Sequence, residues 1–157
     1  MMKWIVAAAF TTSAGMAAAE LVAPTDVAFD DAGAVEVSLS GVTGDAANGA
    51  AIVGDKKQGN CVACHQVGAL SDIEFQGEIG PPLDGAGDRW TESELRGIVA
   101  NSKMTFEGTM MPSYYKTAGY IRPGDAYTGD AASGPLPPLL DAQMVEDVVA
   151  FLATLKE

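Results

Sequence analysis

Cysteine and histidine are scarce in this chain of 157 residues, which holds two cysteines and one histidine. A structural zinc site usually needs about four nitrogen or sulfur ligands, commonly drawn from two separate clusters. The three residues available here stand together in one short stretch of sequence, so they do not favour such a site.

Basic residues are scarce too, since nine Lys and Arg stand against 21 Asp and Glu and leave a net charge of −12. A surface of this sign repels nucleic acid and anionic lipid, so neither is an expected partner. The charge favours solubility and docking onto a basic protein.

A long hydrophobic run is also missing. Residues 4–10 are apolar, whereas a membrane span needs roughly 20 such residues. Lys3 precedes the run, and the small residues Ala17-Ala18-Ala19 follow it, as in a secretory signal. We therefore predict that residues 1–19 are an export signal cleaved after Ala19, and that the rest is a single domain in the periplasm without a membrane partner.

The cysteines and the histidine form one motif, Cys61-Val62-Ala63-Cys64-His65. This C-x-x-C-H pattern is the attachment signal for a c-type haem. Two residues between the cysteines allow Cys61 and Cys64 to form thioethers along one porphyrin edge, and His65 then lies under the iron as its proximal ligand. The motif thus predicts one covalently attached haem c.

Two other uses of the cysteine pair compete with haem attachment. A thioredoxin-like dithiol opens a helix after a strand, and residues 54–60 do not read as a strand. An exported protein can also hold a simple disulfide, but that use leaves the adjoining His65 unexplained. Export favours haem as well, because covalent attachment takes place outside the bacterial cytoplasm.

The iron of such a haem has a sixth position, and no second histidine exists to fill it. A methionine thioether suits iron, and His/Met ligation raises the reduction potential into the electron-transfer range. Met111 is the predicted ligand because Pro112 stiffens its loop. Met110 is a close competitor and Met104 is a third candidate. If all three fill the core instead, the iron is five-coordinate.

Apolar periodicity and end signals predict three helices, over 45–56, 91–102 and 141–156. Asp45 and Asp141 are predicted N-caps, and Thr91 forms a capping box with Glu94. Gly49 is unfavourable inside a helix by about 1 kcal/mol, which indicates close packing at that point. Loops are predicted over 66–90, 103–116 and 117–140.

Residues 20–43 are predicted to form an extended arm ahead of the domain at 44–157. Val35, Val37 and Leu39 alternate with polar residues, a period-two pattern typical of extended chain. An arm of this kind lies along the domain or reaches a partner.

The order of these features resembles a class I cytochrome c, which is an all-α fold. In that family the first and last helices cross at a contact between a glycine and an aromatic residue, here implied to be Gly49 and Phe151. The carbonyl of a proline in a Gly-Pro-x-Leu segment orients the haem histidine, which implies that Pro81 orients His65.

Longer strings narrow the resemblance to the SoxX family, the small mono-haem subunits of the SoxAX cytochromes of bacterial sulfur oxidation. The family ligand methionine precedes Pro-Ser, which implies Met111. A stretch at 123–139, rich in proline and glycine, is longer than the family pattern suggests. The most specific strings are Met111-Pro112-Ser113-Tyr114-Tyr115-Lys116 and Val145-Glu146-Asp147-Val148-Val149-Ala150-Phe151-Leu152.

This resemblance implies a role. SoxAX joins thiosulfate oxidatively to a cysteine of the carrier protein SoxYZ, and the catalytic haem belongs to the SoxA subunit. The expected function is electron transfer from a SoxA-type partner, in a heterodimeric L-cysteine S-thiosulfotransferase, onward to a small cytochrome. The chain alone is then not catalytic. The alternatives are a free-standing diffusible electron carrier, which has no need of the arm at 20–43, and a haem-free thiol or disulfide module.

Overall fold

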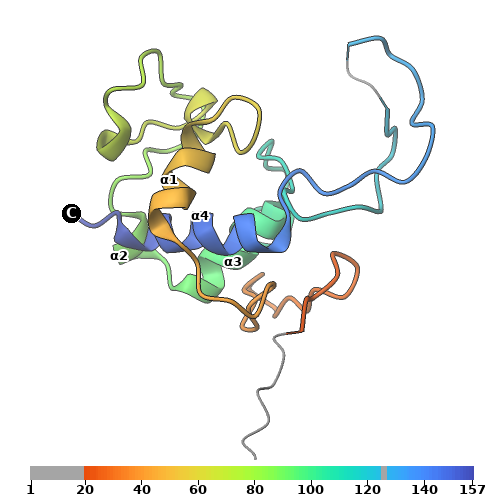
Figure 1. The fold of residues 1–157 in the computed structure, drawn as a ribbon, viewed down its shortest axis with the longest axis horizontal. Helices are drawn as coiled ribbons and strands as arrows, with labels where there is room; N and C mark the ends of the chain where they lie inside the picture. The colour runs from red at the N-terminus through yellow and green to blue at the C-terminus, as the bar shows by residue number, and fades with distance from the viewer. Residues whose placement is uncertain (1–19, 125–126) are drawn as a thin grey trace, which may run out of the picture.

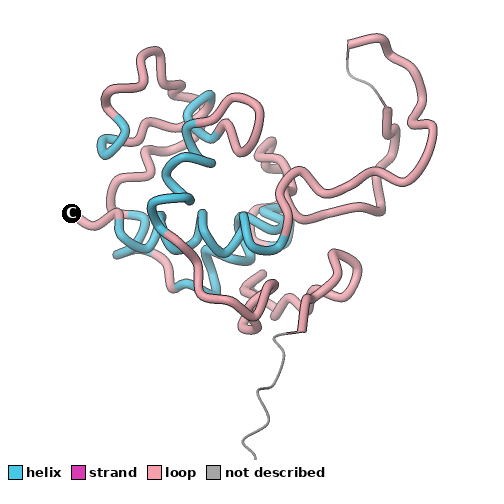
Figure 2. The backbone as a smooth tube through the Cα atoms, viewed as in Figure 1, coloured by secondary structure: helices cyan, strands magenta, loops and turns pink. Residues whose placement is uncertain are grey.

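The computed structural model describes residues 20–124 and 127–157, and the predicted export signal at 1–19 lies outside these residues. Helices and loops make up the described chain, without a strand (Figure 2). The all-α prediction is confirmed. The elements are the helices α1 (Ala46–Gly54), α2 (Ala86–Arg89), α3 (Glu92–Asn101) and α4 (Ala142–Thr154), with the 3₁₀ turns η1 (Cys61–Ala63), η2 (Gly68–Leu70) and η3 (Ser102–Met104).

The three predicted helices begin where their capping residues indicate. The Asp45 side chain accepts hydrogen bonds from the first backbone amides of α1, and the Asp141 side chain accepts one from Met144 N. Thr91 and Glu94 form the full capping box at the start of α3. Each cap satisfies amides that have no partner inside the helix, which explains why these local signals predict where the helices begin.

The short helix α2 lies in a segment predicted to be loop. It is a single turn that follows Gly85, whose φ of +71° is a left-handed conformation that glycine adopts without strain. Gly87 lies against the backbone of Ala153 in α4, where a Cβ would meet the Ala153 carbonyl oxygen at 2.3 Å. This turn exists because of packing on α4, which local periodicity does not reveal.

Helices α1 and α4 cross at close range (Figure 1). A Cβ on Gly49 would lie 2.9 Å from the Cβ of Phe151 and closer still to the backbone of Asp147. The predicted contact between Gly49 and Phe151 is confirmed. Around the crossing lies one apolar core, which buries Ile52 and Val53 of α1, Leu95 and Val99 of α3, and Val145, Val148, Val149 and Leu152 of α4.

The N-terminal arm, residues 20–43, lies along the domain as irregular chain. Val35 and Leu39 are buried, but Val37 is 65% exposed, so the period-two alternation is wrong at its centre. The chain bends at Val37 and again from Leu39, and bends interrupt the strict alternation of side chains that a strand requires. Burial of Val35 and Leu39 in the core holds the arm in place, together with a hydrogen bond that Arg96 Nη1 donates to Val35 O at 2.9 Å.

The described residues of the 117–140 segment, 117–124 and 127–140, form a long loop that extends away from the helices (Figure 1). Its two sides meet at an isolated antiparallel bridge between Gly124 and Ala131. Ile121, which precedes the bridge, is fully exposed. Among the described residues, no helix has the length and apolarity required to cross a membrane.

Candidate haem-attachment site

The C-x-x-C-H motif follows α1 after one tight turn. Asn60 has the left-handed φ of +48°, and the chain then enters η1. The amides of Cys64 and His65 both donate to Cys61 O, at 3.1 and 3.0 Å. This single 3₁₀-like turn keeps the three motif residues close together in space, as attachment to one porphyrin edge requires.

The imidazole of His65 is oriented by a backbone carbonyl. His65 Nδ1 lies 2.7 Å from Pro81 O, the contact that the family resemblance implied. A carbonyl oxygen can only accept, so Nδ1 carries the proton and Nε2 is the basic nitrogen left for a metal. Gly80 makes room for the ring, because a Cβ there would lie 2.3 Å from His65 Cε1.

Both motif cysteines are free thiols in this structure. Burial raises the pKa of Cys61 to about 11, so this thiol is protonated at neutral pH. A reactive redox dithiol has a lowered pKa instead. The environment of Cys61 therefore does not favour the thiol-redox alternative.

Tyr114 joins the methionine loop to the motif, a role that sequence reasoning missed. Its hydroxyl donates to Gly59 O at 2.8 Å and lies close to the Cys61 side chain. Burial raises the pKa of Tyr114 well above its ordinary value, so the phenol stays protonated. The only signal in the sequence was its place in the Pro-Ser-Tyr-Tyr string after Met111.

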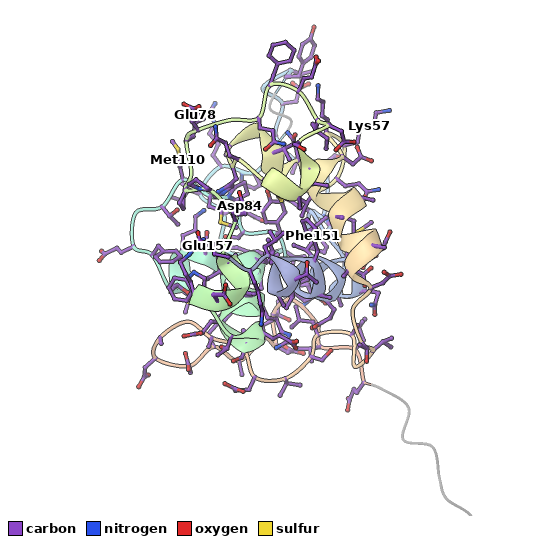
Figure 3. All side chains as sticks on the ribbon, turned by 90° about the vertical axis from the view of Figure 1, so that its left-hand side faces the viewer. Lys57, Glu78, Asp84, Met110, Phe151 and Glu157 are labelled. Atoms are coloured by element: carbon purple, nitrogen blue, oxygen red, sulfur yellow. The ribbon has the colours of Figure 1, made fainter. Side chains whose placement is uncertain are left out.

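The three candidate methionines differ in exposure. Met111 is partly buried and packs against the apolar core. Met110 lies at the outer surface (Figure 3) and is 78% exposed, and Met104 is 48% exposed. A thioether that binds iron inside the domain must be shielded from solvent, and Met111 is the least exposed of the three candidates.

The donor set fits a covalently bound haem. Two free thiols stand on one turn, and an imidazole has one nitrogen held by a carbonyl and the other available. Two glycines of the loop after the motif lie against it. A Cβ on Gly77 would lie 2.1 Å from Ala63 O, and a Cβ on Gly80 would overlap the His65 ring. The loop around Gly77 and Gly80 therefore packs directly on the motif residues that would hold the haem.

A family model for cytochrome c matches residues 46–156, and the chain belongs to the cytochrome c family. The predicted cofactor, covalently attached haem c, is confirmed with this membership. A chain in the crystal structure of SoxXA from P. pantotrophus is 61% identical, with a TM-score of 0.82 over 86% of this chain and 98% of that chain. This match confirms the resemblance to the SoxX family. No curated protein matches the chain.

Proposed function

We propose that this chain is the electron-transferring haem subunit of a SoxAX-type complex in the periplasm. The observation that carries the proposal is the match to a SoxXA chain at 61% identity over 98% of that chain's length. Such identity over a whole chain includes its surface as well as its core, which supports a shared partner.

The site residues take roles that their chemistry allows. Cys61 and Cys64 would hold the haem through thioethers, His65 Nε2 would bind the iron, and the Met111 thioether would be the second protein ligand of the iron. Haem supplies a one-electron redox couple. The Pro81 carbonyl keeps the proton on Nδ1 of His65, which fixes the ring and its tautomer.

This ligand arrangement favours electron transfer over substrate chemistry. If His65 and Met111 both bind the iron, they would leave no ligand position for thiosulfate. The net charge of −12 also repels an anionic substrate. The SoxA-type partner would therefore join thiosulfate to the cysteine of SoxYZ, and this chain would carry the released electrons, one at a time, to a small soluble cytochrome.

The test begins with the exported protein from a host that attaches haem. We expect the mass of residues 20–157 plus one haem, and we expect that acid–acetone does not extract the haem. A bare polypeptide mass would refute covalent attachment, and a different N-terminus would refute cleavage after Ala19.

The second part of the test concerns the partner. The purified chain should exchange electrons but should not oxidise thiosulfate, and activity should appear when a SoxA-type subunit and SoxYZ are added. Co-purification from thiosulfate-grown cells should recover the two subunits together. Thiosulfate oxidation by the chain alone would refute the subunit role, and recovery without any partner would favour the free-standing carrier.

A further inference from the structure

Both polar backbone groups of Met111 are held by side chains. Met111 N donates to Thr109 Oγ1 at 3.3 Å. Ser102 Oγ donates to Met111 O at 3.1 Å, and Lys103 Nζ donates to the same carbonyl oxygen. The carbonyl thus has two donors, both supplied by the residues that directly follow α3.

The anchor for these bonds is rigid. Ser102 has no exposed surface, and α3 is fixed in the core through Leu95 and Val99. The segment after Met111 is tied to the same helix end, because Ser113 Oγ donates to Asn101 Oδ1 at 2.7 Å. Backbone bonds continue the attachment, from Tyr114 N to Val99 O and from Tyr115 N to Ala100 O.

We propose that Ser102 and Lys103 are positioning residues that hold Met111 on the iron and so keep sulfur-containing ligands off it. This inference rests on the proposed function, in which Met111 is the sixth ligand. Ser102 and Lys103 touch neither the haem nor a substrate, and they act only through the Met111 backbone.

We call the two bonds from Ser102 and Lys103 to Met111 O the clamp. Its proposed role is to keep soft sulfur compounds from replacing Met111 on the iron. Thiosulfate, sulfide and thiolates are soft donors, and soft sulfur ligands compete with a thioether for a metal. An external ligand can bind only when the Met111 loop opens, and opening breaks the bonds from Ser102 and Lys103. Each such hydrogen bond changes the open fraction about fivefold at its usual net strength.

The experiment uses the full-length haem-loaded protein in the ferric state. Imidazole and sulfide are titrated separately, and the near-infrared Met-to-iron charge-transfer band reports how much Met111 is displaced. Ser102→Ala and Lys103→Gln should each tighten apparent imidazole binding about fivefold, and the double variant should tighten it further. Sulfide should follow the same order.

Matched controls are present in the chain. Ser40 Oγ donates to Val42 O and accepts from Val42 N, both at 3.1 Å, so Ser40→Ala removes a serine-to-carbonyl bond of the same length in the arm together with one bond from an amide. Lys156 is exposed near the C-terminus, so Lys156→Gln removes an equal charge. Both controls should stay within about twofold of the parent protein, which is below the effect of one hydrogen bond.

Equal imidazole affinity in the site variants and the controls would overturn the clamp. If Ser102→Ala does not fold, the exposed Lys103→Gln decides the question by itself, with circular dichroism to show that it is folded. Met111→Ala tests the ligand assignment independently of the bonds from Ser102 and Lys103. If that variant keeps the band, the ligand assignment and the clamp both fail. If it loses the band while Ser102→Ala and Lys103→Gln match the controls, only the clamp fails.

Discussion

A Cβ atom on Gly49 would lie 1.9 Å from the carbonyl oxygen of Asp147, so the backbones of α1 and α4 are in contact where they cross. No side chain fits between them. The crossing sets the path of the chain into the C-x-x-C-H motif, which begins after the turn that ends α1. A side chain at position 49 would push α1 away from α4, and the start of the motif would move with α1.

Gly49→Leu should destabilise the fold by at least about 1–3 kcal/mol, because overpacking at a backbone contact forces the helices apart. Urea denaturation of the haem-loaded protein measures this change. Gly134→Leu is the control, since no atom lies within 4 Å of the corresponding Cβ. An equal denaturation midpoint for the two variants would show that the crossing tolerates a side chain.

Met111→Ala should abolish the near-infrared Met-to-Fe(III) band and lower the reduction potential, because His/Met ligation keeps that potential high. Met110→Ala should leave both unchanged, as expected for a side chain that is 78% exposed. Absorption spectroscopy and redox titration give the two readouts. Loss of the band in Met110→Ala alone would assign the ligand to Met110.

The ion pair between Arg96 and Glu146 is buried, with side-chain exposures of 8% and 5% and an Nε–Oε1 distance of 2.8 Å. Glu146 Oε1 also accepts from Leu39 N at 2.7 Å, which ties the arm to α4. Arg96→Met should cost on the order of 3–5 kcal/mol, because it leaves a buried carboxylate without its partner.

The matched control is the double variant Arg96→Met/Glu146→Leu, which removes both charges. It should unfold at a higher urea concentration than Arg96→Met alone, since no unpaired charge is left. A double variant that is less stable than the single variant would indicate that the bond to Leu39 N matters more than the ion pair.

Asp147 should make stability depend on pH in acid. Burial would raise its pKa, but hydrogen bonds from Asp45 N, the Asn48 side chain and the Gln143 side chain outweigh burial and lower the pKa below its ordinary value. A lowered pKa in the folded state stabilises the protein above the unfolded-state pKa, near 3.9 for aspartate, and this contribution is lost as pH falls through the folded value.

Asp147→Asn should therefore be less stable than the parent protein at pH 7, and the gap should narrow as pH falls below the unfolded-state pKa near 3.9. Urea midpoints across this range provide the measurement. A gap that stays constant with pH would mean that ionisation of Asp147 does not contribute.

The arm at 20–43 needs point variants because Val35 and Leu39 are part of the core, so deletion would destabilise the domain as well as remove any docking surface. Val37 and Val42 are 65% and 55% exposed and can be changed without opening the core. We expect Val37→Ser and Val42→Ser to keep the denaturation midpoint and to weaken binding to the SoxA-type subunit in a titration. Unchanged affinity would remove the docking role.

Several features could be predicted because their chemistry is local. Cys61, Cys64 and His65 lie within five positions, and the caps at Asp45, Thr91 and Asp141 act within one helical turn. Family resemblance added the contact of His65 with Pro81 and that of Gly49 with Phe151, and the structure has both. The ligand role of Met111 stays a prediction.

What the sequence alone determined is thus the haem motif, the helices α1, α3 and α4, and the charge, since each depends on residues close together in the chain. Only the tertiary structure decided that Val37 faces solvent, that α2 forms on α4, that Tyr114 reaches Cys61, and that Ser102 and Lys103 hold Met111. These features depend on where separate segments meet. A hydrogen bond between distant segments leaves no periodic pattern in a sequence, because its partners are chosen by packing of the whole core.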